Sequence, residues 1–107
     1  MATITVVTDT DVGVINISAI DEDWTYSSGD IYVNFIEFTP GGDADKIVVR
    51  HKTSSGIKMG TLDSSDSQSS ILYYDGKRFT PMIVFSECTL SADHEVVISY
   101  NAGFRRT

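Results

Sequence analysis

The sequence predicts an all-β protein with a single domain over residues 1–107, folded as an antiparallel β-sandwich or jelly roll of seven to eight short strands. Three observations lead to this prediction. Apolar residues recur with a period of two, turn residues separate the resulting runs, and no window of a dozen residues carries a helical stripe. A chain of 107 residues suits one domain and leaves no room for two.

The predicted strands follow one another at short intervals along the chain. They cover residues 3–8, 12–18, 31–38, 46–52, 70–74, 78–86 and 95–100, with a weaker candidate over 57–62 that Gly60 interrupts. The run over 31–38 is the strongest, because β-branched and aromatic residues favour strands.

Turn residues connect these runs. Residues 40–43, Pro-Gly-Gly-Asp, predict a hairpin connection between the strands on either side. Asp75-Gly76 predicts a two-residue type I′ turn, because both central residues of that turn need positive φ. Pro81 lacks an N–H, so its strand is expected to lie at an edge, to bulge, or to begin after this residue.

Several predicted strands carry apolar side chains on both faces. In the run over 31–38, one face offers Ile31, Val33 and Phe35, and the other offers Tyr32, Ile36 and Phe38. The runs over 70–74 and 78–86 show the same feature. A sandwich has one core between its sheets, so we expect the outward apolar groups to be covered by loops or by neighbouring subunits.

Residues on these outward faces, together with two aromatic residues and a basic tail, form the predicted interface. It consists of Trp24, Tyr26, Tyr32, Ile36, Phe38, Tyr74, Met82, Arg105 and Arg106. Trp24 and Tyr26 fit equally a plug at the end of the sandwich. Arg105 and Arg106 fit either a contact with an acidic neighbour or a frayed terminus.

The net charge of −7 argues against nucleic acid as a partner, because acidic side chains repel the phosphate backbone. The first 45 residues contain nine acidic residues and no Lys or Arg, whereas the other 62 contain eight basic and six acidic residues. This asymmetry fits complementary faces that meet on assembly, or an evenly acidic surface once the chain is folded. No apolar run approaches the roughly 18 residues that span a bilayer, and no secretory signal is expected.

We expect no catalytic, metal or cofactor site. Asp9-Thr10-Asp11 resembles the Asp-Thr-Gly of aspartic proteases, but Asp11 replaces the glycine that the tight turn requires. His51 and His94 lie in runs that fit a solvated strand end and a turn. The acidic clusters do not match an EF-hand, and no Cys/His cluster exists for zinc. Cys88, the single cysteine, is expected to be a small buried residue.

The segments IYVNFIEFTPGGDADKIVVRHK, SSILYYDGKRFTPMIVFSECTLS and EVVISY together resemble small β-sandwich structural proteins of tailed bacteriophages. The resemblance covers residues 30–100 and rests on strand order and turn placement. It implies a non-enzymatic virion protein, specifically a capsid decoration (cement) protein that is made in the host cytoplasm and sits on the capsid surface. Its implied partners are itself, as a homotrimer, and the major capsid protein or another virion protein.

A carbohydrate- or receptor-binding module of a phage tail or fibre is the alternative. Aromatic residues could form a platform for sugar rings in such a module; the candidates are Trp24, Tyr26, Tyr32, Tyr73 and Tyr74.

Overall fold

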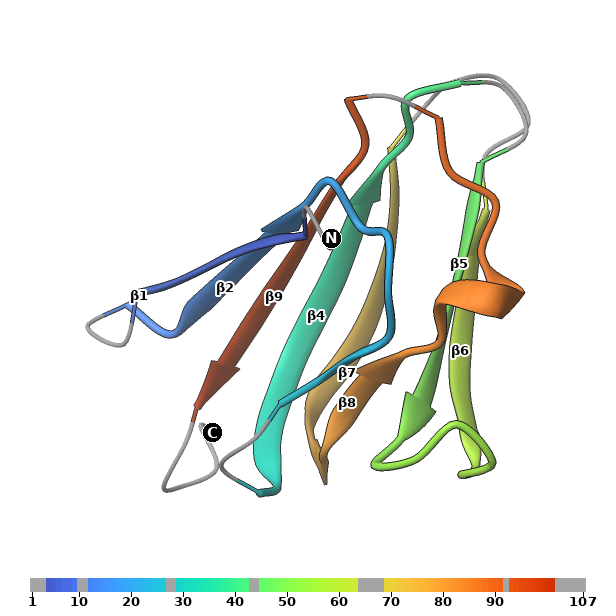
Figure 1. The fold of residues 1–107 in the computed structure, drawn as a ribbon. Coiled ribbons are helices and arrows are strands. Elements are labelled where there is room, and N and C mark those ends of the chain that lie inside the picture. Colours follow the sequence, from blue (N-terminus) through green and yellow to red (C-terminus); the bar gives the residue numbers. More distant parts are fainter. Residues whose placement is uncertain are drawn as a thin grey trace.

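Two antiparallel β-sheets pack face to face in the computed structural model, which describes residues 4–9, 12–26, 29–42, 45–63, 69–91 and 93–101 (Figure 1). The five-stranded sheet has the order β1 (Thr5–Asp9), β2 (Val14–Ser18), β9 (Glu95–Asn101), β4 (Ile31–Thr39) and β7 (Ser70–Phe79). The four-stranded sheet has the order β3 (Trp24–Thr25), β8 (Pro81–Ile83), β5 (Lys46–His51) and β6 (Lys58–Asp63). A 3-10 turn, η1 (Phe85–Glu87), follows β8. In these described ranges, no helix is long and apolar enough to cross a membrane.

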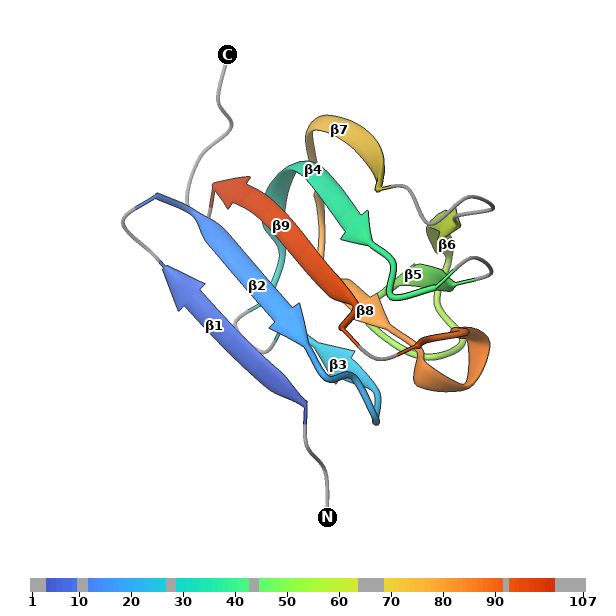
Figure 2. The same ribbon diagram turned by 90° about the horizontal axis from the view of Figure 1, so that it is seen from above.

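The strand pairing has jelly-roll topology. β2 pairs with β9, β3 with β8, β4 with β7 and β5 with β6, so the first half of the chain pairs in reverse order with the second. Successive pairs alternate between the two sheets, as a long hairpin does when it rolls into a sandwich. The predicted fold class is therefore confirmed. β1 stands outside this nested set and extends the five-stranded sheet beyond β2 (Figure 2).

A β-bulge at Asn34, halfway along β4, changes which of its residues face the core. Against β9, Val33 pairs with Tyr100 and Phe35 pairs with Ser99, so Asn34 is an extra residue. An extra residue moves every side chain beyond it to the opposite face of the sheet. Before the bulge the odd-numbered residues Ile31 and Val33 face the core, and after it the even-numbered residues Ile36 and Phe38 do so.

This bulge corrects the prediction that Ile36 and Phe38 face a partner. Both side chains are 0% exposed and lie in the core between the sheets. β4 has one core face, and the apparent second face came from counting the alternation straight through Asn34.

The connections also differ from those predicted. Asp75 and Gly76 have positive φ, 53° and 83°, as predicted, but they form a bulge inside the continuous strand β7 and make no hairpin turn. Lys77 pairs with Val33 and Tyr73 with Phe35, so residues 74–76 lie opposite Asn34. The predicted hairpin over 40–43 is wrong as well, because β4 and β5 belong to different sheets. The two-residue strand β3 was not predicted.

The segment that follows β7 crosses between the sheets at Thr80. Phe79 ends β7, and Pro81 begins β8, where its missing N–H is tolerated. The Thr80 N–H donates to His51 Nδ1 over 3.2 Å. Ile83 enters the core, and Met82 on the other face of β8 is also buried. The prediction that Met82 is an interface residue is therefore wrong, because other segments of the same chain cover it.

Hydrogen bonds to the Asp45 carboxylate join the connection between β4 and β5 to the segment before β9. The side chain is buried; its Oδ2 accepts hydrogen bonds from the Gly41 and Ser91 N–H groups over 2.8 and 3.0 Å. The Ser91 hydroxyl donates to Oδ1 over 2.8 Å. Burial alone raises the pKa of Asp45, but hydrogen bonds from Ser91, Gly41 and Gly42 outweigh it and lower this pKa below the ordinary 3.8.

The bulged register predicts losses of stability of different size when each of the two phenylalanines of β4 is replaced by alanine. Phe38→Ala is expected to lower the free energy of unfolding by about 3 to 5 kcal/mol, because it empties a filled core site. Phe35→Ala is expected to cost about 1 kcal/mol, because Phe35 is half-buried on the outer face. Urea unfolding followed by far-UV circular dichroism measures both. A larger loss for Phe35→Ala would show an unbulged strand.

The lowered pKa of Asp45 predicts that the protein loses stability in acid. Its folded-state pKa is lowered, so its contribution is complete above the ordinary pKa of 3.8 and is lost as the pH falls below that value. Asp45→Asn is expected to be less stable than the wild type at pH 7 and to lose less stability on acidification. Urea midpoints measured between neutral pH and pH 3 check this. Parallel pH profiles of the two proteins would contradict the role given to this carboxylate.

Candidate functional site

The outer face of the five-stranded sheet carries apolar side chains on each of its strands, exposed on β1 and β7 and half-buried on β2, β9 and β4. Cross-strand pairing aligns Val14, Ser99, Phe35 and Tyr73 in one row on this face. It aligns Val7, Asn16, Val97, Glu37 and Ile71 in the neighbouring row. The apolar members of the two rows form a patch that we call the outer apolar band: Val7, Val14, Phe35, Ile71, Tyr73 and Val97.

Three members of the outer apolar band are well exposed in the single subunit. Tyr73 is 68% exposed, Val7 59% and Ile71 37%. The rings of Phe35 and Tyr73 lie 6.2 Å apart and are tilted by 59°. This tilted contact is typical of packing between aromatic rings, so the two rings do not form one coplanar surface.

Polar side chains border the outer apolar band where β4, β9 and β7 run together. Asn34, the bulge residue, donates from Nδ2 to Ser99 Oγ over 3.3 Å and accepts from Asn101 Nδ2 over 3.4 Å. Tyr32 lies under the Arg78 guanidinium, 5.9 Å from the ring centre. The Arg78 guanidinium also lies 3.7 Å from an Asp30 carboxylate oxygen. The bulge therefore places an amide-rich, charged rim beside an apolar centre.

The structure separates the residues that the sequence grouped as an interface. Trp24 and Tyr26 are half-buried against the core, as the plug alternative proposed. Tyr74 points to the inner side of β7, where its hydroxyl donates to the Met59 carbonyl over 3.1 Å and burial raises its pKa to about 12. Among the described residues of the predicted set, Tyr32 alone borders the outer apolar band. Arg105 and Arg106 lie outside the described residues.

The five aromatic residues of the carbohydrate alternative are also divided. Tyr32 and Tyr73 lie on the outer face, whereas Trp24, Tyr26 and Tyr74 pack against the core. Among the described residues they do not make one platform.

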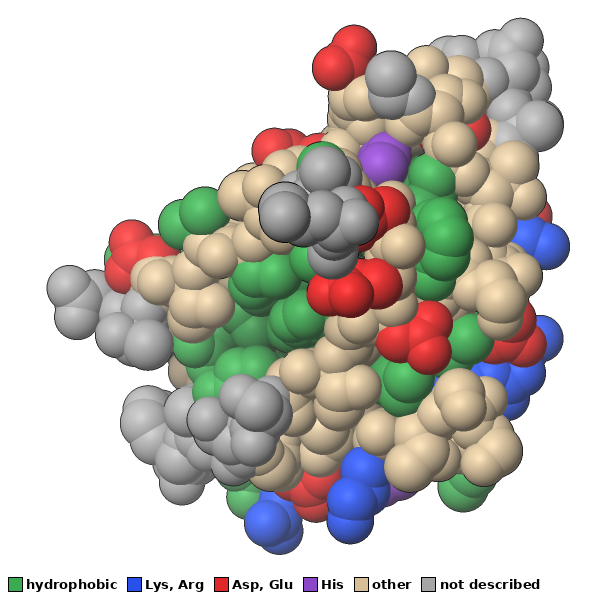
Figure 3. Space-filling model, in the orientation of Figure 1, with side chains coloured by type: hydrophobic (Ala, Val, Ile, Leu, Met, Phe, Trp, Pro, Cys, Tyr) green, Lys and Arg blue, Asp and Glu red, His purple; other side chains and the backbone are tan. Residues whose placement is uncertain are grey.

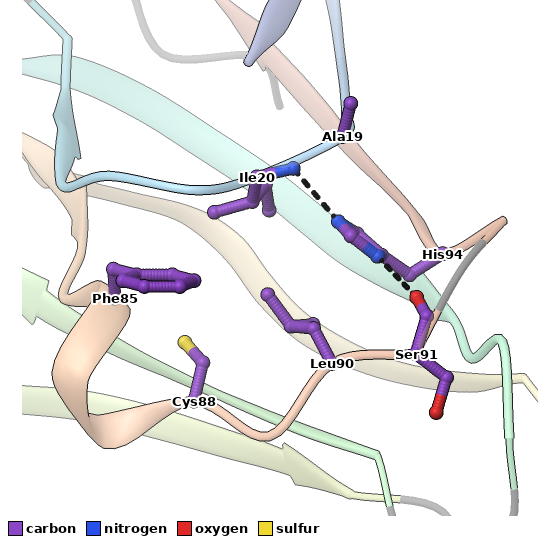
Figure 4. A pocket seen from close by; sticks show the side chains of 7 residues that line it. All are labelled: Ala19, Ile20, Phe85, Cys88, Leu90, Ser91 and His94. Carbon is purple, nitrogen blue, oxygen red and sulfur yellow. Dashed lines mark hydrogen bonds between the residues drawn. The ribbon is translucent and has the colours of Figure 1, made fainter. Parts of the chain in front are cut away.

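An open hollow of about 450 Å³ lies at one end of the sandwich, beside η1 (Figure 4). Ala19, Ile20, Phe85, Cys88, Leu90, Ser91 and His94 line it. The two His94 ring nitrogens are engaged within the protein: Nε2 accepts the Ile20 N–H over 2.9 Å, and Nδ1 lies 2.7 Å from the Ser91 carbonyl oxygen. Through these two contacts, His94 holds together the segment at Ile20 and the segment at Ser91.

Cys88 in this hollow is a thiol in an acidic, partly apolar setting. Its Sγ donates to the Val84 carbonyl over 3.3 Å. Burial raises the pKa of Cys88 above the ordinary 9.0, and the negative charges of Glu87 and Asp23 add to this. A hydrogen bond from the Val48 N–H and the positive charge of Lys46 lower this pKa without reversing the shift. Within the described ranges, no three His, Cys, Asp or Glu side chains gather closely enough to hold a metal ion.

No protein-family model matches the chain, and no curated protein sequence matches it. Among solved structures, a family 6 carbohydrate-binding module is similar over 100% of this chain and 85% of its own length, with 20% sequence identity and a TM-score of 0.45. A TM-score of this size marks a loose correspondence. The architecture described above therefore rests on the strand pairing of this chain itself.

Cys88 is expected to react slowly in the native protein. The thiolate is the reactive form, and a raised pKa with partial burial reduces both its amount and its access. With Ellman's reagent near pH 8, we expect the native rate to be at least about tenfold below that of the urea-unfolded chain. Equal rates in the two states would contradict this setting for the thiol.

Proposed function

We propose that this chain is a non-catalytic structural protein that docks onto a protein surface through the outer apolar band, and that this surface belongs to a phage virion. The specific role we propose is capsid decoration. One observation carries the docking proposal: Val7, Ile71 and Tyr73 stand exposed on one sheet face of a subunit whose core is already filled.

The chemistry of the outer apolar band suits a protein partner. Aliphatic side chains from β1, β9 and β7 contribute to it beside two aromatic rings. Burying apolar area gives roughly 25 cal/mol per Å², a gain that aliphatic and aromatic groups share when they meet another apolar surface. Polar residues lie between the apolar members within the two rows, and Asn34 and Arg78 border the band; the polar residues within the rows are Asn16, Glu37 and Ser99. A surface of apolar groups with polar neighbours is typical of a protein interface.

The virion part of the proposal is supported by the resemblance of residues 30–100 to phage structural proteins. Jelly rolls occur in viral capsid proteins and in lectins, so the fold is compatible with a capsid role and with sugar binding alike. The proposed partners are the major capsid protein or another virion protein.

Carbohydrate binding is the second candidate, because one observation favours it. The Tyr73 ring is largely exposed and stands across the strand pair from Phe35, next to the bulge that presents the Asn34 amide. A single exposed ring with a nearby amide can bind one sugar unit. A glycan array in which Tyr73→Ala abolishes the hits, together with no binding to capsids, would favour this candidate over docking.

Tyr73→Lys is expected to weaken capsid binding at least about tenfold, because it places a charge within the buried contact. The measurement is co-sedimentation of purified protein with expanded, undecorated capsids of the encoding phage. Ile57→Lys is the matched control: it puts the same charge at an exposed apolar residue in the connection between β5 and β6, outside the band. No binding by the wild-type protein, or equal binding by Tyr73→Lys, would overturn the proposal.

A further inference from the structure

We propose that two copies of this chain associate through β1, edge to edge. The two β1 strands would pair in antiparallel orientation about a two-fold axis that passes between Val7 of one copy and Val7 of the other. This inference does not rest on the proposed function, because it concerns the edge of the five-stranded sheet and a second copy as the only partner.

β1 is an edge strand without the bulges, prolines or basic residues that usually prevent pairing with another strand. It pairs with β2 on one side, and no other described strand lies on its outer side. All five residues are exposed. Four of them, Thr5, Val6, Val7 and Thr8, are β-branched, and the strand contains no Lys, Arg, Pro or Gly. A regular, exposed edge of this composition is a template for pairing with another strand.

The other described sheet edges carry the devices that block such pairing. β7 has the bulge at residues 74–76 followed by Lys77 and Arg78. β6 begins with Lys58, and a register shift interrupts its pairing with β5. β3 is two residues long. Short edges, bulges and basic residues prevent edge-to-edge association, so β1 differs in kind from these three.

The four-stranded sheet does not fully cover the inner side of β1. Val6 pairs with Ile17, so it faces the inner side, yet it is 39% exposed while Ile17 is in the core. Val7 on the outer side is 59% exposed. Figure 3 shows apolar side chains gathered in a hollow over the inner side of this part of the sheet, beside the segment that carries β3. A strand added beside β1 would cover apolar surface on both of its faces.

The sequence of β1 is complementary to itself in the antiparallel register. Centring the two-fold axis on Val7 pairs all five residues: Val7 with Val7 of the second copy, Val6 with Thr8, and Thr5 with Asp9. The apolar and β-branched groups then lie opposite one another, and no Asp9 lies opposite another Asp9. A two-fold pairing closes after two copies, so the assembly is a dimer.

One strand from each copy makes a small interface. It belongs to the low end of the size range for specific contacts, so we expect a dimer that dissociates on dilution. Sedimentation velocity over a wide concentration range should show the wild-type protein passing from monomer to dimer.

The experiment uses charge at the symmetric position. In the proposed register, position 7 faces position 7, so Val7→Lys alone and Val7→Glu alone each place like charges in contact and should self-associate at least about tenfold more weakly than the wild type. An equimolar mixture of the two variants places opposite charges in contact and should form a heterodimer. Val7 is exposed, so both variants should fold; recovery in the mixture would also show that each has done so.

Two controls separate this result from the docking proposal. Ile57→Lys and Tyr73→Lys change exposed residues away from β1 and should dimerise like the wild type. A wild-type monomer at every concentration, a trimer as the family resemblance implies, undiminished dimerisation of Val7→Lys, or a mixture that stays monomeric would each overturn the inference. Failure of capsid binding with dimerisation intact would reject the docking proposal alone.

Discussion

The β-bulge at Asn34 is the constraint on which the rest of the structure depends. β4 lies between β9 and β7, so the phase of its side chains sets which residues of both neighbours face the core. With one extra residue at Asn34, and residues 74–76 bulged opposite it, Ile31 and Val33 before the bulge and Ile36 and Phe38 after it all point inward. The same change of phase sends Phe35 and its partner Tyr73 outward. The filled core and the outer apolar band are therefore two consequences of one backbone irregularity.

The sequence was sufficient to predict the strands and insufficient to predict the faces. Alternation and turn residues identified eight of the nine strands in the described part of the chain, β6 from a weaker pattern and β4 and β9 nearly to the residue, because a period of two is a local property. A bulge breaks that period without a local signature other than a polar residue in an apolar run, here Asn34. Asp75-Gly76 shows the same limit: positive φ suits a type I′ turn and a bulge equally, and only the pairing of β7 with β4 on both sides of it decides.

The candidate site was harder to predict, because exposure depends on neighbours that are distant in sequence. Met82 is apolar on the outer side of β8 and yet buried, whereas Tyr73 is apolar on the outer side of β7 and open. The alternation pattern of the sequence places both on the outer side of a strand and does not distinguish them. The difference is that β8 lies in the middle of its sheet and is followed by η1, while β7 lies at an edge. The two-faced strands that indicated assembly are in large part explained within one subunit, and the argument for docking now rests on a different and smaller set of residues.

The two proposed surfaces meet at Val7, and their geometry makes them cooperate. An antiparallel pairing of identical strands places the two-fold axis perpendicular to the sheet, so the outer faces of both copies lie on the same side. The dimer would then present one continuous ten-stranded sheet, five strands from each copy, with two outer apolar bands directed toward the same partner surface. A repeating surface such as a capsid lattice could engage both bands at once, and the second contact would form at a high effective concentration. Two weak contacts, each limited by the acidity of a chain with a net charge of −7, would then hold the protein on a lattice far more firmly than either contact alone.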